Sequence, residues 1–271
     1  MDFTSYLKLI RPVNCIMAAI ATVIGFFVSN NSTSFNIHTL LLMISAFLIC
    51  GAGQAINDYF DIEVDKKKKL NKPLVSGKIS PKNALAFSIS LFLVGVILAF
   101  VVNLTAFAIA LIFSLLLFVY SWKMKNTKFF GNILVSIGTA APLIFGSTIN
   151  QNYEITSIFA LSAFFANMGR EITKDIEDKK ADLGEKKTLA QTIPLPTLKM
   201  IVFAMYAAAI TSAAIVLLKK PNQTYPILLT ISAILFLATW FTLYKNNPNK
   251  SQKLSKIAMI VSLLAFLSWV I

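Results

Sequence analysis

Long apolar segments alternate with short polar connections along almost the whole chain. Each apolar segment holds about 17–22 residues, enough for an α-helix to cross the roughly 30 Å of hydrocarbon in a bilayer. Helix-capping residues and prolines mark several connections, as Ser80-Pro81 does before the third segment. The pattern predicts an all-α, polytopic membrane protein with nine transmembrane helices, at approximately residues 12–30, 38–57, 84–102, 104–122, 129–149, 155–173, 197–218, 224–244 and 254–271.

The composition agrees with a chain whose solvent is the bilayer. Hydrophobic residues make up 56% of the 271 residues, charged residues make up only 14%, and the mean hydropathy is +0.71. Soluble domains carry about 25% charged residues. We therefore expect a single transmembrane domain over residues 1–271, placed in the cell membrane as a multi-pass protein.

The basic residues predict the orientation of these helices. With the amino terminus inside, 23 of the 25 lysines and arginines fall on the inner side, and only Lys219 and Lys220 fall outside. The positive-inside rule therefore predicts an N-in, C-out arrangement. This topology, with attraction to anionic lipid headgroups, accounts for the net charge of +13. Nucleic-acid binding is not expected, because the lysines lie in short loops and not in a separate basic domain.

Six of the seven aspartates fall into two copies of one pattern, D-x-x-D-x-x-x-D, at the inner ends of the second and sixth apolar segments. On a helix this spacing places the three carboxylates of a copy on one stripe, where they repel one another unless a cation joins them. Oxygen ligands suit Mg²⁺, which usually bridges carboxylates to substrate phosphates. The pattern predicts a site for divalent metal and phosphate, formed by Asp58, Asp61 and Asp65 in the first copy and by Asp175, Asp178 and Asp182 in the second.

The two copies also predict an internal repeat. They lie 117 residues and four helices apart, and an even number of helices makes the repeat parallel, with its axis along the membrane normal. Two parallel halves bring both aspartate stripes to one face of a central cavity. A cation transporter is a remote alternative, because a conducting path needs acidic groups near the midplane. The simplest structural alternative is that the two aspartate motifs are solvated helix ends at the membrane interface and bind no metal.

Several further segments match a known family in order and spacing. They are Arg11-Pro12-x-Asn14, Asn57-Asp58-x-x-Asp61-x-x-x-Asp65, Asn71-Lys72-Pro73-Leu74-x-Ser76-Gly77, Tyr120-x-x-Lys123-x-Lys125, and Asp178-x-x-x-Asp182 followed by Gly184 and Thr188-Leu189. On these residues the sequence resembles the UbiA superfamily of intramembrane prenyltransferases over essentially its full length. The stretch from Arg170 to Asp178 makes it look most like the archaeal synthases of digeranylgeranylglyceryl phosphate.

The resemblance implies a lipid-synthesis enzyme. It implies Mg²⁺-dependent transfer of a geranylgeranyl group from geranylgeranyl diphosphate to the free hydroxyl of geranylgeranylglyceryl phosphate, which forms an ether. An aromatic acceptor, as in quinone-type pathways, is the alternative, because residues of the acceptor pocket are not identified by the sequence. The membrane cavity would hold the isoprenoid chain and keep water from a reactive allylic cation.

The resemblance also implies roles for individual residues. The catalytic residues are expected to be Asp61, Asp65, Asp178 and Asp182. The metal site is expected to include these four with Asn57, and Asp58 and Asp175 are expected to take supporting or water-mediated positions in it. The substrate-binding residues are expected to be Arg11, Asn14, Asn57, Lys72, Lys123, Lys125, Arg170 and Lys174.

Several of these residues also have a simpler structural explanation. Arg11 and Arg170, the only arginines in the chain, and the lysines Lys123 and Lys125 could each be membrane anchors on the inner side. Lys72 stands where many family members have arginine, so it keeps the charge but loses the planar fork of donors. Asn14 suggests a buried amide that lines a cavity or bonds to a neighbouring helix. An aromatic belt explains Tyr120 and Trp122.

Overall fold

A computed structural model of the chain describes residues 3–67, 70–124, 128–179, 188–219 and 223–271. All its regular elements in these ranges are helices. Every apolar segment expected to span the membrane forms a helix, with ends close to the expected ones. These helices are α2 (Pro12–Asn30), α3 (Ile37–Phe60), α5 (Pro81–Val102), α6 (Leu104–Val119), α7 (Lys128–Ser147), α8 (Glu154–Asp178), α10 (Leu195–Ile215), α11 (Thr224–Tyr244) and α12 (Pro248–Ser268).

Eight of these helices, over the described residues, are long and apolar enough to cross a membrane. The helix that falls outside this group is α8, which at 25 residues is the longest of the nine. Its last third carries six charged side chains between Arg170 and Asp178. The length of α8 is therefore sufficient for it to span a membrane, and the charged residues in its last third lower its mean hydropathy.

Polar side chains at the helix starts explain several boundaries. The Asn36 side chain accepts a hydrogen bond from the Thr39 amide at 2.9 Å, and Ser80 accepts one from the Asn83 amide at 3.2 Å. Such N-caps satisfy backbone donors that a helix leaves free at its first turn. Asn103 ends α5 and caps α6 through the Ala106 amide at 2.8 Å, so this single polar residue separates the two helices.

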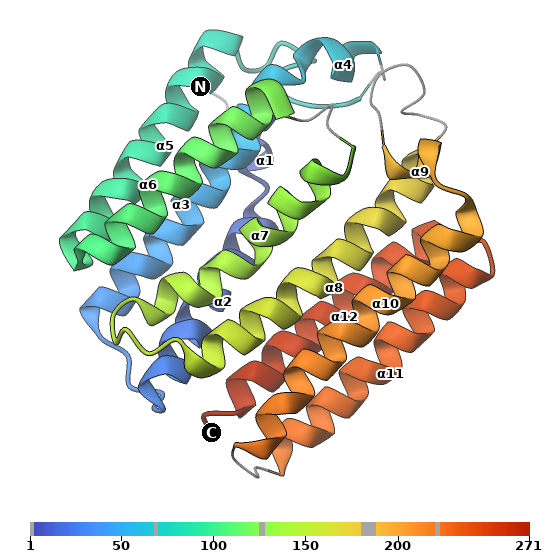
Figure 1. The fold of residues 1–271 in the computed structure, drawn as a ribbon. Helices are drawn as coiled ribbons and strands as arrows, with labels where there is room; N and C mark the ends of the chain where they lie inside the picture. The colour runs from blue at the N-terminus through green and yellow to red at the C-terminus, as the bar shows by residue number, and fades with distance from the viewer. Residues whose placement is uncertain (1–2, 68–69, 125–127, 180–187, 220–222) are drawn as a thin grey trace.

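Three short helices and one turn of π-helix were not expected from the sequence. The short helices are α1 (Phe3–Ile10), α4 (Ile62–Lys67) and α9 (Leu189–Thr192). The π-helical turn, Tyr120–Met124, continues α6, and a 3₁₀ turn, Val216–Leu218, continues α10. In Figure 1, α4 and α9 lie at one end of the bundle, and the carboxyl terminus lies at the opposite end.

The helices pack in the same order in the two halves of the chain. In the first half α2 packs on α3, α3 on α5 and α5 on α6, and in the second half α7 packs on α8, α8 on α10 and α10 on α11. The last helix, α12, packs on α11, α8 and α2, which joins the halves (Figure 1). The side chains of α5, α6 and α11 that face outward are mostly large and apolar, as lipid contact requires.

The two halves also meet where α2 crosses α7. A Cβ atom added at Gly146 would lie 1.8 Å from the Thr22 carbonyl oxygen, and one added at Gly25 would lie 2.0 Å from the Leu143 carbonyl oxygen. The backbones of the two helices therefore touch, and only glycine fits at both crossing positions. Ser147 strengthens the crossing, because its hydroxyl donates to the Gly25 carbonyl at 3.3 Å.

Candidate active site

The first aspartate motif lies where α3 ends and α4 begins. Asp58 is in the last turn of α3, Asp61 is at the break between the helices with φ −91° and ψ 0°, and Asp65 is in α4. The helix bends at Asp61, but backbone hydrogen bonds from Asp61 N to Asn57 O and from Asp65 N to Asp61 O continue across the bend. Asp58 and Asp65 therefore still face one cation, Lys72.

Two cations hold the buried carboxylates of this motif. Lys72 Nζ lies 2.9 Å from Asp58 Oδ1 and 2.7 Å from Asp65 Oδ2, and Arg11 Nη2 lies 2.7 Å from the same Asp58 oxygen. Asp58 is 3% exposed and Asp65 is 5% exposed. Buried charges of this kind persist only when they are paired. Arg11 and Lys72 therefore hold motif carboxylates in this structure, as well as lying beside the expected diphosphate site.

The position of Arg11 depends on an unusual backbone conformation. Its φ of 52° and ψ of 70° lie in the left-handed region, at the junction between α1 and α2. A residue other than glycine is held in this region only when its surroundings compensate for the strain. The ion pair with Asp58 is one such contact, and it ties the α1–α2 corner to the end of α3.

Lys72 is positioned by the connection that follows α4. Leu74 and Ile79 of this connection are buried beside Leu9, Ala55 and Ala84, so the loop is packed against α1, α3 and α5. Gly77 has φ 73°, a left-handed conformation in which glycine is favoured. The loop therefore brings Lys72 back over the aspartates that precede it.

Asn57 and Asp61 form the more open part of the first motif. The Asn57 side-chain amide donates to Asp61 Oδ2 at 3.1 Å, and both side chains are half-buried. The amide oxygen of Asn57 and the carboxylate of Asp61 are the oxygen ligands that Mg²⁺ accepts. Their chemistry fits the expected metal site.

The second motif lies at the end of α8. Asp175 accepts a hydrogen bond from Asn132 Nδ2 of α7 at 2.8 Å, and Asp178 is the last residue of α8 and is half-buried. Asp182, the third member, lies outside the described residues, as does Lys125. Within the described residues no three carboxylate, histidine or cysteine side chains converge as a metal site. The second motif is thus described only in part.

Tyr120 lies between the two motifs. It belongs to the π-helical turn after α6, its ring edge faces Gly131 of α7, and it is electrostatically coupled to Asp61, Asp175 and Glu171. A π-helical turn widens a helix locally and is frequent at functional sites. Tyr120 packs on α7 and lies within electrostatic range of carboxylates from both halves. Trp122, by contrast, is 55% exposed.

The other expected substrate-binding residues divide into two groups. Arg170 donates to Glu171 Oε1 at 2.6 Å and is largely enclosed, whereas Lys174 is exposed. Asn14 is also exposed, in the first turn of α2, and its expected role in substrate binding stays a prediction. Lys123 is exposed as well, and its Nζ lies 4.1 Å from the centre of the Trp122 ring, as expected for a residue at the membrane surface.

Three polar residues beside the site were not identified from the sequence. Asn132 orients Asp175, Asn167 donates to the Ser136 hydroxyl at 3.2 Å, and Glu171 pairs with Arg170. Each of them is at most 9% exposed. An isolated polar residue inside an apolar segment is the signal that identifies such positions.

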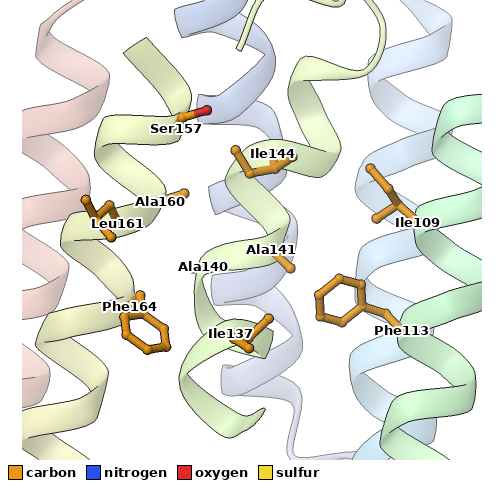
Figure 2. Close-up of a pocket in the computed structure, with 10 residues that line it drawn as sticks. All are labelled: Ile109, Phe113, Ile137, Ala140, Ala141, Ile144, Ser157, Ala160, Leu161 and Phe164. Carbon is orange, nitrogen blue, oxygen red and sulfur yellow. The ribbon is translucent and has the colours of Figure 1, made fainter. Parts of the chain in front are cut away.

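An apolar pocket of about 410 Å³ lies between α6, α7 and α8. In Figure 2, Ile109 and Phe113 of α6 face Ile137 and Ile144 of α7, with Phe164 among the α8 residues on the other side. Only Ser157 among its lining residues carries a polar side chain. The pocket is an open apolar groove and not an enclosed cavity, because its lining residues Leu161 and Ile137 are 47% and 37% exposed.

The comparisons with known proteins agree with this geometry. Residues 18–266 match the model of the UbiA prenyltransferase family. A digeranylgeranylglyceryl phosphate synthase of Methanopyrus kandleri is 34% identical over 97% of this chain and 98% of its own length. One from Methanococcus aeolicus is 38% identical over 96% of this chain and 95% of its own.

Solved structures extend the agreement to the fold. A structure of a digeranylgeranylglyceryl phosphate synthase superposes with a TM-score of 0.82 at 34% identity, covering 97% of this chain and 96% of that one. A UbiA homologue from Archaeoglobus fulgidus, bound to GPP and Mg²⁺, superposes with a TM-score of 0.69 at 19% identity over 97% of this chain and 99% of its own. By its sequence over nearly its whole length, and by its fold, the chain belongs to the UbiA prenyltransferase family, and it is a multi-pass membrane enzyme.

Proposed function

We propose that the enzyme transfers a geranylgeranyl group from geranylgeranyl diphosphate to the free hydroxyl of geranylgeranylglyceryl phosphate, and so makes the second ether of an archaeal membrane lipid. The observation that carries this proposal is similarity of 34–38% to synthases of this product over nearly the full length of both chains. The relatives described above are named for this synthase, which favours the glyceryl phosphate over an aromatic acceptor.

The metal of the proposed reaction is Mg²⁺, held by oxygen ligands of the two motifs. Asn57, Asp61 and Asp178 would hold it, with Asp182 as the further expected ligand and Asp65, now paired with Lys72, beside them. When bound, Mg²⁺ supplies positive charge to the diphosphate and so stabilises it as a leaving group. Magnesium in the Archaeoglobus fulgidus homologue supports this choice.

The residues of this chain prepare the site for an anionic donor. Arg11 and Lys72 offset the charges of Asp58 and Asp65, which lowers the repulsion between the carboxylates and the incoming diphosphate. Lys72 joins Asp58 to Asp65 across the helix break, and the side chain of the intervening Asp61 is held by the Asn57 amide at 3.1 Å. The preorganised charges act without rearrangement at the moment of reaction.

The reaction then needs a dry site for the carbon that loses the diphosphate. Breaking the bond between C1 and the diphosphate oxygen leaves an allylic cation, and the acceptor hydroxyl oxygen forms the new bond to C1 and releases its proton. Apolar walls exclude water, which would otherwise compete for the cation. The pocket between α6, α7 and α8 offers a path of this character for an isoprenoid chain.

The same proposal includes the topology. We infer that α8 crosses the membrane as a ninth span, since its 25 residues extend about 37 Å at 1.5 Å per residue. The matching packing order in the two halves supports a parallel repeat, and the basic residues support the N-in, C-out orientation.

The proposed function is tested with the purified full chain and labelled geranylgeranyl diphosphate, with and without Mg²⁺. Geranylgeranylglyceryl phosphate and 4-hydroxybenzoate are supplied separately as acceptors. We expect metal-dependent label in the glyceryl phosphate only. Label in the aromatic acceptor only would contradict the proposed acceptor. Transfer that persists in EDTA would contradict the proposed dependence on Mg²⁺.

A further inference from the structure

Arg170 and Lys174 of α8 and Lys256 of α12 form a group of basic side chains, in which Arg170 is half-buried and Lys174 and Lys256 are exposed. The two helices pack on each other and run in opposite directions (Figure 1). At the end that carries the aspartates, Asn249 Nδ2 of α12 donates to Glu177 Oε1 of α8 at 2.8 Å. Seven residues further into the bundle on each helix stand Arg170 and Lys256. Seven residues are almost two whole turns, so both remain on the facing sides, about 10 Å from the Asn249 contact.

The electrostatic contacts of Lys256 agree with this register. Its ammonium interacts with Arg170 and Lys174, and with the carboxylates Glu171 and Glu177. Glu171 is engaged by Arg170 at 2.6 Å, and Glu177 by Asn249. Neither Lys174 nor Lys256 has a hydrogen bond or an ion pair to any residue in the described ranges. Three cations thus share this region with two carboxylates, of which Glu171 is paired with Arg170 itself and Glu177 is bonded to the neutral Asn249.

Lys256 belongs to a helix that is apolar enough to span the membrane, and its side chain is exposed there. Lys256 stands eight residues after the first residue of α12, about 12 Å along a helix that is apolar enough to span. Like charges within a membrane-spanning region are costly and usually belong to a binding site or pathway. Arg170 presents the planar fork of donors that suits phosphate, and a lysine acts beside it as a point charge.

We propose that Arg170, Lys174 and Lys256 bind the phosphate monoester of the acceptor. The inference rests on the proposed function, in which the acceptor is a glyceryl phosphate. Arg11 and Lys72 hold the carboxylates of the first motif, so these three basic residues form a second anion site, separate from the metal-bound diphosphate. Arg170 lies eight residues, or about 12 Å, along α8 from Asp178.

The separation between the two anion sites matches the chemistry of the substrates. Glycerol has three carbons, so the free hydroxyl lies only a few bonds from the phosphate of the acceptor. A phosphate held at the basic group places this hydroxyl between the group and the aspartates, where C1 of the donor must be. The group therefore selects acceptors that carry a phosphate, and it orients their hydroxyl toward the donor.

The test measures both substrates separately with the full-length Lys256→Gln enzyme. We expect the KM for geranylgeranylglyceryl phosphate to rise about 10-fold or more, because one charge-assisted contact is lost. The KM for geranylgeranyl diphosphate is expected to stay within about twofold of the wild-type value, because the donor diphosphate is bound elsewhere. Lys250→Gln is the matched control, since Lys250 is exposed on α12 and lies about 120° around the helix from Lys256.

A second acceptor separates phosphate binding from a structural role. Geranylgeranylglycerol lacks the phosphate, and the wild-type enzyme should use it poorly. Lys256→Gln should reduce the difference in KM between the two acceptors. Lys256→Arg should keep that difference. Three results for Lys256→Gln would overturn the inference. They are an unchanged acceptor KM, as expected for a lysine that only extends to the membrane surface, a rise in the donor KM alone, and a fall in kcat alone.

The outcome for the wild-type enzyme keeps the two proposals apart. If wild type does not use geranylgeranylglyceryl phosphate, the proposed function fails and this inference fails with it. If wild type uses this acceptor and Lys256→Gln has unchanged kinetics, only the inference fails. Arg170→Lys gives an independent check that keeps the charge near Glu171, and we expect its acceptor KM to rise because the fork geometry is lost.

Discussion

At the scale of single residues, Lys72 contacts two buried carboxylates at once. Removing its charge would leave Asp58 and Asp65 buried with less compensation, and breaking a buried pair typically costs about 3–5 kcal/mol. We expect Lys72→Met to lower the thermal stability of the purified protein and Lys78→Met, an exposed position in the same connection, to leave it unchanged. Adding Asp58→Asn to Lys72→Met should recover part of the loss.

The double variant decides whether this effect is electrostatic. If Lys72 acts only through its apolar stem, Asp58→Asn would add its own destabilisation and recover nothing. The measurement is the midpoint of thermal unfolding for wild type, both single variants and the double variant in one detergent. Additive shifts would contradict the coupling between Lys72 and Asp58.

Asp61 and Asp178 are expected to act in catalysis and not in folding. Asp61→Asn and Asp178→Asn should each lower kcat by about 100-fold or more, a usual loss when one group that stabilises transition-state charge is removed. Both variants should elute as wild type in size-exclusion chromatography. Glu63→Gln is the matched control, because Glu63 is exposed in α4 and its ion pair among the described residues is with the exposed Lys66. Wild-type turnover in either aspartate variant would refute the assigned metal site.

The sequence predicted the residues with the most distinctive spacing. The aspartates and Asn57 stood out because carboxylates are rare in this chain and their pattern occurs twice. Tyr120 was found in a family-matching segment but was interpreted as part of an aromatic belt, because no pattern of apolar residues signals the π-helical turn that positions it. Asn132 and Glu171 were missed because their partners, Asp175 and Arg170, become neighbours through packing of α7 on α8 and through side-chain rotamers.

At the scale of helices, apolar length predicted the spanning elements well, and it failed where short polar segments decide the structure. The nine segments became helices because twenty apolar residues in lipid must satisfy their backbone internally. The short helix α4 and the break at Asp61 were not expected, because three regularly spaced aspartates suggest a continuous helix. The site geometry depends on that break, so the exact partners of Asp58 and Asp65 were beyond prediction.

The crossing of α2 and α7 gives a prediction for a helix contact. Gly146→Ala would place a methyl group 1.8 Å from the Thr22 carbonyl oxygen, so the helices must separate. Overpacking of this kind usually costs about 1–3 kcal/mol. Gly138→Ala in the same helix is the matched control, because nothing lies within 4 Å of its added methyl group. We expect lower thermal stability for Gly146→Ala only, and equal midpoints for both variants would contradict the close crossing.

At the scale of the whole molecule, the function of the site depends on both aspartate motifs reaching the same side of the membrane. Asp61 belongs to the end of α3, and Asp178 to the end of α8, so both motifs reach the same side only if α8 crosses the bilayer. With eight spans and α8 outside the membrane, the segments before and after α8 would lie on the same side. The topology is therefore open to direct measurement.

Single cysteines before and after α8 distinguish the two topologies. In a background with Cys15→Ala and Cys50→Ala, Asn152→Cys lies before α8 and Thr197→Cys lies after it, and both positions are exposed. An impermeant maleimide applied to intact cells should label Asn152→Cys, and Thr197→Cys should react only after the membrane is opened. Ser76→Cys, in the connection after the first motif, should behave like Thr197→Cys, because both motifs then face the inner side. Labelling of Asn152→Cys and Thr197→Cys from the same side would exclude the ninth span, and with it the parallel repeat that brings the two aspartate motifs together.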